Sequence, residues 1–273
     1  MAKSVARYAG DCTMTLPDNY LDRYLDRIGF GEPIAHDLAT LTALQQAHLS
    51  TVAFENLDVF SRVPVRTDTD WSVAKIVDRR RCGWCFENNG AFSWLLGRLG
   101  FPVLTLGAAV LLGGPNKIID HATLEVQLDR PYLVDVGFGD SFSIPLALNQ
   151  SGPQDGGTAT FEFLPSAEGV TLAEHVDGLP EARYRFRRVA HRMNEFDEAS
   201  GRLQADETAH WRKLPFATRL IDGGPDRVTL LADRLKLRRG GVVTEDPVSS
   251  DDWDDVLWEW FEMLSPTRTP PTP

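Results

Sequence analysis

The side chain best placed for chemistry in this sequence is the thiol of Cys85, which follows a basic run at positions 79–81 and a glycine at position 83. Beyond it, apolar residues recur at helical spacing up to a glycine at position 100, so the pattern predicts a helix that begins near Cys85. A thiol at a helix N-terminus meets unpaired backbone N–H groups and the positive end of the dipole, and nearby arginines add to this field. Because these effects favour the thiolate, we predict that Cys85 is a nucleophile.

Cys82 and Cys85 also form a Cys-x-x-Cys pair, which allows two other interpretations. The pair could be half of a zinc site, but only Cys12 remains to complete it. It could instead be a dithiol redox motif, although such motifs follow a buried strand and this one follows a run of charge. A free cysteine is also often a small core residue. The redox and core interpretations stay open beside the nucleophile.

Histidine and aspartate side chains that could assist a thiol lie on two predicted strands. His121 begins a segment in which apolar and polar residues alternate, and Asp135 interrupts the apolar run that follows. A carboxylate in a strand interior is costly to bury without a partner. A two-residue turn would place Asp135 opposite Leu124, on the face away from His121, so contact requires a loop of odd length or a bulge. Pro131, which cannot donate to the ladder, favours such an irregular hairpin.

These three side chains together indicate a Cys–His–Asp triad. The imidazole of His121 would take the proton of the Cys85 thiol, and the Asp135 carboxylate would fix the tautomer and support the positive charge. Such a triad serves either transfer of an acyl group or hydrolysis by water. A cysteine hydrolase therefore stays open as an alternative function.

The patterns N-terminal to Cys85 predict helices that support it. Asp18 is expected to cap a first helix, and a second should run over residues 37–50, where we interpret His48 as structural. The polar and aromatic turn at residues 53–58 contains Glu55. We expect Glu55 either to form a buried ion pair with the basic run or to lie in a solvated turn.

The patterns beyond residue 100 are mostly those of strands. Residues 103–112 are β-rich, and residues 228–231 and 234–237 resemble a hairpin. Ser249, three residues before an aspartate, is expected to open a last helix. The apolar face of that helix would be formed by Trp253, Val256, Leu257, Trp260, Phe261 and Leu264.

Composition limits the classes of protein that fit. The chain has 273 residues with 42% hydrophobic composition, which can bury a substantial core. The net charge of −11 argues against a nucleic-acid partner, which needs a basic face. No run of about 18 apolar residues occurs, and residues 1–7 lack the apolar core of a signal peptide. With three cysteines, too few for a disulfide framework, we expect a cytoplasmic protein that contacts no membrane.

A resemblance to a known family follows from the order of these motifs. The stretch from Arg81 to Asn89 resembles the Arg-Gly-Gly-x-Cys-Phe-Glu-x-Asn signature of the arylamine N-acetyltransferases, with Cys82 in place of the first glycine. Five further segments are similar to that family and keep its order: residues 24–29, 54–58, 121, 135–139 and 234–241.

The resemblance implies an α+β fold in three parts. Residues 1–100 would form a helical bundle that carries Cys85. Residues 101–205 would form an antiparallel β-barrel that carries His121 and Asp135. Residues 206–273 would form an interdomain segment and an α/β lid.

The resemblance also implies an activity and a set of site residues. Cys85 would take an acetyl group from the cosubstrate acetyl-CoA and pass it to the nitrogen of an arylamine or arylhydrazine, with ping-pong kinetics and no metal. Cys85, His121 and Asp135 would be catalytic. The residues that would bind substrate are Phe54, Val110, Gly137, Phe138 and Gly139. Ordinary core packing and barrel geometry are the alternative roles for these positions.

Residues 207–216 depart from the family pattern. They replace the Ser/Thr/Pro-rich segment that in the family contacts CoA, which weakens the inference of acetyl-CoA as donor. The alternative is the amide-synthase branch, whose members close macrolactams from a polyketide thioester bound to a carrier protein. The second departure is Cys82, which replaces a glycine of the family signature. We hypothesise that oxidation could join Cys82 and Cys85 in a disulfide.

Overall fold

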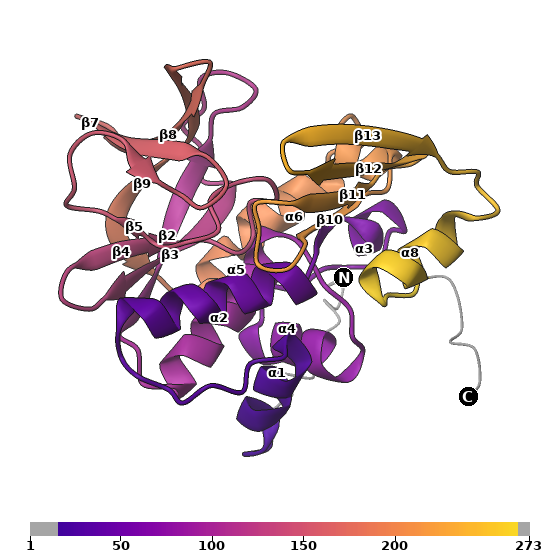
Figure 1. Ribbon diagram of the computed structural model, residues 1–273, viewed down its shortest axis with the longest axis horizontal. Coiled ribbons are helices and arrows are strands. Elements are labelled where there is room, and N and C mark those ends of the chain that lie inside the picture. Colours follow the sequence, from indigo (N-terminus) through magenta and orange to yellow (C-terminus); the bar gives the residue numbers. More distant parts are fainter. Residues whose placement is uncertain (1–15, 267–273) are drawn as a thin grey trace, which may run out of the picture.

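The helices of the N-terminal part surround the start of the helix that carries Cys85. The computed structural model describes residues 16–266. In Figure 1 most of these helices lie in the lower part of the molecule, below a barrel and a second sheet. They are α1 (Tyr20–Ile28), α2 (Leu38–Thr51), α3 (Leu57–Phe60), α4 (Thr69–Asp78) and α5 (Cys85–Arg98).

An eight-stranded antiparallel sheet forms the second part and curls into a nearly closed barrel (Figure 1). Its strand order is β5-β4-β3-β2-β9-β8-β7-β6. Aromatic side chains such as Phe142, Phe161, Tyr184 and Phe186 fill its interior. The strands are β2 (Val103–Val110), β3 (His121–Gln127), β4 (Pro131–Val134), β5 (Leu146–Ala147), β6 (Gln154–Asp155), β7 (Thr160–Ser166), β8 (Gly169–Val176) and β9 (Leu179–His191).

The C-terminal part contains a five-stranded antiparallel sheet with the order β1-β10-β11-β12-β13. Its first strand, β1 (Phe54–Glu55), comes from the N-terminal part, so this sheet is not built from residues 206–266 alone. The other elements are the 3-10 helix η1 (Met193–Phe196), α6 (Asp197–Ala205), α7 (His210–Lys213), β10 (Ala217–Leu220), β11 (Arg227–Leu230), β12 (Arg234–Arg239), β13 (Val242–Pro247) and α8 (Trp253–Phe261).

The α+β class, with helices and a nearly closed antiparallel barrel, is confirmed. The hairpin expected over residues 228–237 is also present, as β11 paired with β12. The division of the chain at residues 100 and 205, and the function of the last part as a lid, stay predictions. Parts of the first and last segments, residues 1–15 and 267–273, lie outside the described residues.

Helix α5 begins at Cys85, as the spacing predicts. It ends before Gly100, whose positive φ of 88° lets the chain turn back so that Phe101 N donates to Leu96 O. The apolar face of the helix packs in the helical core, where Phe92 and Leu95 are fully buried. This packing fixes the position of the helix start against the barrel.

The hairpin between β3 and β4 has the odd loop that a contact between His121 and Asp135 requires. Leu124 lies opposite Val134 and Gln127 lies opposite Pro131, so three residues connect the strands. Continuing this register places Asp135 on the same face of the sheet as His121. The prediction of an irregular hairpin is confirmed.

Two predicted helix starts were wrong. Asn19 stands at the N-cap of α1 and makes no side-chain capping bond, so Asp18 does not cap this helix. Helix α8 begins at Trp253 with Asp252 at its N-cap, so Ser249 does not open it. The predicted pairing of Ser249 with Asp252 is present, but in the turn that precedes the helix. His48, by contrast, is structural as predicted: it is fully buried in α2.

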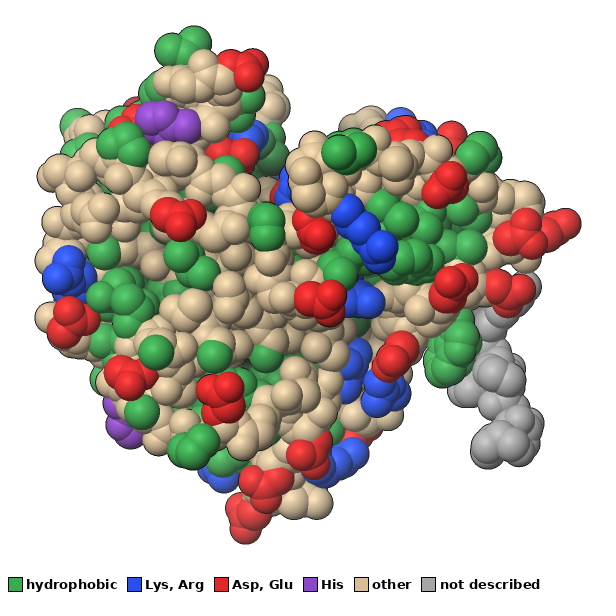
Figure 2. Space-filling model, viewed as in Figure 1, with side chains coloured by type: hydrophobic (Ala, Val, Ile, Leu, Met, Phe, Trp, Pro, Cys, Tyr) green, Lys and Arg blue, Asp and Glu red, His purple; other side chains and the backbone are tan. Residues whose placement is uncertain are grey.

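Acidic side chains do not gather in one patch on the face that Figure 2 shows. Figure 2 shows Asp and Glu side chains scattered over the visible face, with a notch between the barrel and the C-terminal sheet. Within residues 16–266, no helix combines the length and the apolar character that crossing a membrane requires.

Candidate active site

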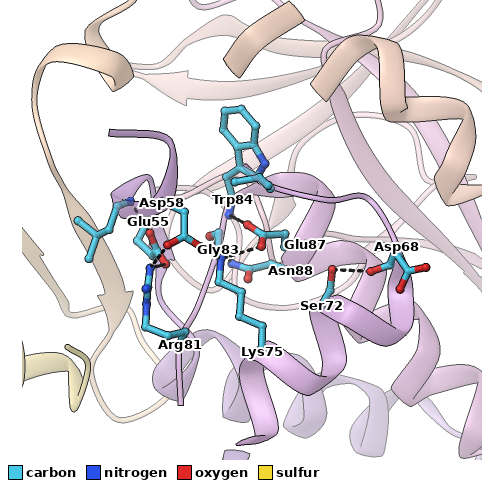
Figure 3. A network of polar contacts seen from close by, with 12 residues as sticks. Glu55, Asp58, Asp68, Ser72, Lys75, Arg81, Gly83, Trp84, Glu87 and Asn88 are labelled. Carbon is cyan, nitrogen blue, oxygen red and sulfur yellow. Dashed lines mark hydrogen bonds and ion pairs between the residues drawn. The ribbon is translucent and has the colours of Figure 1, made fainter. Parts of the chain in front are cut away.

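A group of five charged side chains, four of them buried and the fifth partly buried, lies beneath the start of α5 (Figure 3). We call this group, formed by Glu55, Asp58, Lys75, Arg81 and Glu87, the charge platform. Lys75 Nζ lies 2.6 Å from Asp58 and 2.7 Å from Glu87. Arg81 lies 2.9 Å from Glu55 and 3.0 Å from Asp58. Of the two expectations for Glu55, the ion pair with the basic run is therefore the one found, with Glu55 buried and Arg81 partly buried.

Ionisation within the charge platform is set by burial and by mutual attraction. Burial disfavours the charge on Lys75, but Glu87, Glu55 and Asp58 outweigh it and raise the pKa of Lys75. Burial raises the pKa of Glu87 to about 7, although Lys75 opposes this shift. Removing one member of the platform would leave its partner as a buried charge without compensation, which destabilises the folded state.

Glu87 connects the charge platform to the start of α5. Its Oε2 accepts a hydrogen bond from Trp84 N at 3.4 Å, one residue before Cys85. A Cβ at position 83 would lie 2.3 Å from the same Oε2, so only glycine leaves space for this carboxylate. The platform thus fixes the loop that leads into Cys85.

The thiol, imidazole and carboxylate expected to form a triad are brought together. His121 Nε2 lies 2.7 Å from Asp135 Oδ2, and both side chains are buried. The Cys85 thiol lies close enough to His121 to help raise the pKa of the imidazole. Cys85 Sγ also lies 3.9 Å from Asp120 O. The arrangement can hold a proton between sulfur and nitrogen while the carboxylate orients the ring.

The pKa shifts of the pair follow from their contact. Burial disfavours the charged form of His121, but the negative charge of Asp135 and hydrogen bonds to Asp135 and Cys85 outweigh it and raise its pKa to about 10. Burial likewise disfavours the charge on Asp135. His121 and two hydrogen-bond donors, Asn89 and Gly137 N, nevertheless lower the pKa of Asp135. The site therefore favours an imidazolium beside a carboxylate.

Asn89 joins the helix to both strands of the hairpin, a role that the sequence reading did not assign. Its Nδ2 donates to Asp135 Oδ1 at 2.9 Å and to Ala122 O at 2.7 Å. Its Oδ1 accepts from Val136 N at 3.0 Å. The signal was available, because Asn89 follows Cys85 by one helical turn and so shares its face.

Two predicted glycines have steric roles. A Cβ at Gly137 would lie 2.7 Å from Cys85 Cα and 2.6 Å from Asn89 Nδ2, so glycine lets the chain pass against the start of α5. Gly139 has a φ of 90°, and its Cβ would lie 3.0 Å from the ring of Phe54. Both positions shape the site by bringing backbone close to other groups.

A cavity of about 580 Å³ opens above Cys85 and His121. Four of the residues predicted to bind substrate line it: Phe54, Val110, Gly137 and Phe138. Gly139 and Asp135 do not line it, since Gly139 packs behind Phe54 and Asp135 lies behind His121. The other lining residues, which the sequence reading missed, include Asn56, Trp84, Leu112, Asn116, Asp120, Leu203, His210, Trp211 and Phe216.

The segment that departs from the family pattern forms one wall of this cavity. Asn56 Nδ2 donates to Trp211 O at 2.7 Å and to Leu214 O at 2.8 Å, and its Oδ1 accepts from Phe216 N at 2.8 Å. Trp211 Nε1 donates to Leu203 O at 2.9 Å. These bonds hold the indole of Trp211 in the cavity wall. No local pattern indicates this placement, because Asn56 is far from the segment along the chain.

Cys82 lies in a different environment from Cys85. Its Sγ accepts a hydrogen bond from Ala53 N at 3.1 Å, and it packs in the helical core. Burial raises the pKa of Cys82 to about 11. Both thiols are free. Within residues 16–266, no group of three or more Cys, His, Asp and Glu side chains is arranged to hold a metal ion.

Comparison with known proteins defines the class of this fold and site. A family model described as N-acetyltransferase matches residues 37–265. The solved structure of the arylamine N-acetyltransferase of Mycobacterium marinum superposes with a TM-score of 0.82 at 29% identity, covering 89% of this chain and 92% of that one. The structure of the same protein in complex with CoA superposes with a TM-score of 0.81.

Two curated relatives narrow the class. The chain is 36% identical over 151 residues to the arylamine N-acetyltransferase pineal gland isozyme NAT-3 of Gallus gallus, which is 53% of this chain and 52% of the relative. It is 35% identical over 175 residues to the arylamine N-acetyltransferase of Mycolicibacterium smegmatis, which is 61% of this chain and 64% of the relative. The chain thus spans about half to two thirds of the length of these relatives. It belongs to the arylamine N-acetyltransferase family, as the motifs indicated.

Proposed function

We propose that this chain transfers an acetyl group from acetyl-CoA through Cys85 to the nitrogen of an arylamine or arylhydrazine. The observation that carries the proposal is the contact of Cys85, at the start of α5, with the buried pair of His121 and Asp135 on the floor of the cavity. In this proposal Cys85, His121 and Asp135 are the catalytic residues.

The first half-reaction loads the enzyme. The Cys85 thiol gives its proton to His121, and the thiolate attacks the acetyl carbonyl of acetyl-CoA. A bond forms between Cys85 Sγ and the acetyl carbon, the bond from that carbon to the CoA sulfur breaks, and His121 returns the proton to the leaving thiolate. Asp135 stays ionised throughout and supports the imidazolium.

The second half-reaction relieves the acetyl-enzyme. The amine nitrogen attacks the acetyl carbon, the bond to Cys85 Sγ breaks, and the amine proton passes through His121 to the sulfur. Because the donor product leaves before the acceptor reacts, the kinetics are ping-pong. The backbone N–H of Cys85, in the first turn of α5 where amides lack helical partners, is our candidate donor to the oxyanion.

Three observations support this choice of substrates. The Mycobacterium marinum relative was solved in complex with CoA. The curated relatives carry the name arylamine N-acetyltransferase. The cavity is within the size range of small-molecule sites, and aromatic side chains of Phe54, Phe138 and Trp211 line it as an aromatic acceptor would require. With so few cysteines we also propose a cytoplasmic location.

The amide-synthase alternative follows from the altered segment. Residues 207–216 form part of the cavity wall and differ from the family segment that contacts CoA. A donor held on a carrier protein would then replace acetyl-CoA, and a macrolactam would be the product. The dithiol oxidoreductase is disfavoured by the separate burial of Cys82, whereas a hydrolase would use the same triad.

Intact-protein mass spectrometry after brief exposure to acetyl-CoA tests the proposal. We expect one added acetyl group on the unmodified chain, none on Cys85→Ala, and its loss when an arylamine or hydrazine is added. Loss of the acetyl group to water at the same rate without amine would indicate a hydrolase. No adduct on folded protein with a reactive Cys85 thiol would overturn acetyl-CoA as donor and favour the carrier-bound thioester.

A further inference from the structure

Asp120 places a carboxyl group in the wall of the catalytic cavity, next to His121 in sequence. Its Oδ1 accepts a hydrogen bond from Val110 N at 2.8 Å, and its Oδ2 accepts one from Asn116 Nδ2 at 2.7 Å. Both donors are uncharged. These bonds hold the carboxyl group in one position at the end of β2, and they do not neutralise its negative charge.

The other charged groups around the cavity do not cancel this charge. Among the described residues that line the cavity, none is lysine or arginine. His121 faces Asp135 at 2.7 Å, so that pair carries no net charge when the imidazole is protonated. His210 is exposed at the cavity wall and meets the ring of Trp211 edge to face, with ring centroids 5.0 Å apart. Arg202, which also acts on Asp120, donates to Ile119 O from outside the cavity lining.

Partial burial makes the charge of Asp120 effective inside the cavity. Burial raises the pKa of this carboxyl group, and the hydrogen bonds from Val110 and Asn116 oppose the shift. A fixed charge acts more strongly across a cavity with apolar walls than across water. Once Cys85 carries an acetyl group its sulfur is uncharged, so Asp120 then sets the sign of the field that an acceptor meets.

We propose that Asp120 is a specificity-determining residue, which makes the cavity favour neutral and cationic acceptors over anionic ones. The inference rests on the proposed function, because it concerns the acceptor of the same cavity. The acceptors favoured are small aromatic amines or hydrazines whose ring substituents are uncharged or basic, and carboxylated arylamines are disfavoured.

Three probes of matched shape test the proposal: 4-aminobenzamidine, 4-aminobenzamide and 4-aminobenzoate, which are cationic, neutral and anionic. Their binding to Cys85→Ser is measured by calorimetry without an acyl donor, so neither acetyl transfer nor the charge of a Cys85 thiolate affects the result. We expect the amidine to bind about tenfold or more tightly than the benzoate. Equal binding of the two would overturn the proposal.

Two variants separate charge from support of the loop. Asp120→Asn removes the charge, and we expect the ratio between amidine and benzoate to fall to about one. Asn116→Ala removes the hydrogen bond to Asp120 but keeps its charge, so the ratio should persist. A ratio unchanged in Asp120→Asn, or lost equally in Asn116→Ala, would overturn the role of the charge.

The same probes, used to discharge the acetyl-enzyme, extend the test to catalysis. Here the rate constants should follow the same order as the affinities. Failure to form an acetyl-enzyme would count against the proposed function and would leave the binding result intact, so the two failures are distinguishable.

Discussion

Two groups of largely buried charges contact the start of α5, and they are built differently. In the charge platform, Lys75 contacts two carboxylates and Arg81 contacts two, with Asp58 shared between them. In the triad, one carboxylate contacts one imidazole, and the imidazole turns its other side to a thiol. Each charged side chain of the platform contacts another member of the platform. The triad, in contrast, includes the Cys85 thiol, which can react.

This difference separates support from chemistry. Removing one member of a closed network leaves a buried charge without a partner, which costs stability. Removing one member of the triad should leave fewer buried charges unpaired, but in the proposed reaction it would stop the proton transfer that the thiol needs. Each of the following predictions tests whether the two groups can be separated in this way.

The largest effect is expected for Asp135→Asn. The amide cannot support the imidazolium of His121, so kcat/KM for acetyl transfer should fall by about 10³- to 10⁴-fold. Unfolding free energy, measured with urea, should change by only about 1–2 kcal/mol because the amide keeps a similar shape. Activity within tenfold of the unmodified chain would show that Asp135 is not part of the reaction.

The converse is expected for Lys75→Met. Glu87 loses its cationic partner, and Asp58 keeps only Arg81, so unfolding free energy should fall by about 3–5 kcal/mol. The double variant Lys75→Met with Glu87→Gln should recover part of this loss, since it removes the unpaired carboxylate. Urea unfolding measures stability, and acetyl transfer per folded molecule should stay within a few fold. Loss of activity in fully folded protein would contradict the separation.

A pH-dependent effect should distinguish the triad from the platform. The pKa of His121 is raised from 6.5 to about 10, so the folded chain holds this proton more tightly than the unfolded chain. His121 therefore adds stability that is complete below pH 6.5 and is lost as the pH rises towards 10. Urea unfolding of the unmodified chain and of His121→Gln at both ends of this range should show the difference in stability narrowing. A constant difference would argue against the raised pKa.

The smallest effect is expected for Cys82→Ala. This thiol belongs to neither group of charges, and its loss should cost about 1 kcal/mol through a small cavity and a missing hydrogen bond. Acetyl transfer should be unchanged. As a control, both chains are treated with peroxide and then with a reductant. Reversible inactivation that disappears in Cys82→Ala would instead support pairing of the two thiols.

Local rules were sufficient to predict much of the triad. The position of Cys85 at a helix start follows from apolar spacing and a glycine stop, both confined to one segment. The shared face of His121 and Asp135 follows from the parity of one hairpin loop. Each inference needed only neighbouring residues, because period and turn length are properties of short stretches of chain.

The groups that surround the triad depend on tertiary placement. Nothing near Lys75 in sequence indicates that it is buried, because the three carboxylates that raise its pKa, two of them in direct contact, come from other elements. Asp120 could have been read as an ordinary loop residue, since its role depends on where the loop folds over the cavity. Trp211 reaches the cavity only because Asn56 holds its segment. Such contacts between distant parts of the chain leave no periodic pattern.

The short strand β1 has a consequence for how the protein forms during synthesis. Phe54 pairs with Thr218, and Glu55, next to it, belongs to the charge platform beneath α5. The residues that finish this pairing leave the ribosome long after Cys85. Contacts of such long sequence separation form slowly. We therefore expect a nascent chain that ends before Ala217 to carry a poorly ordered Cys85 loop, open to proteases and alkylating reagents until β10 is in place.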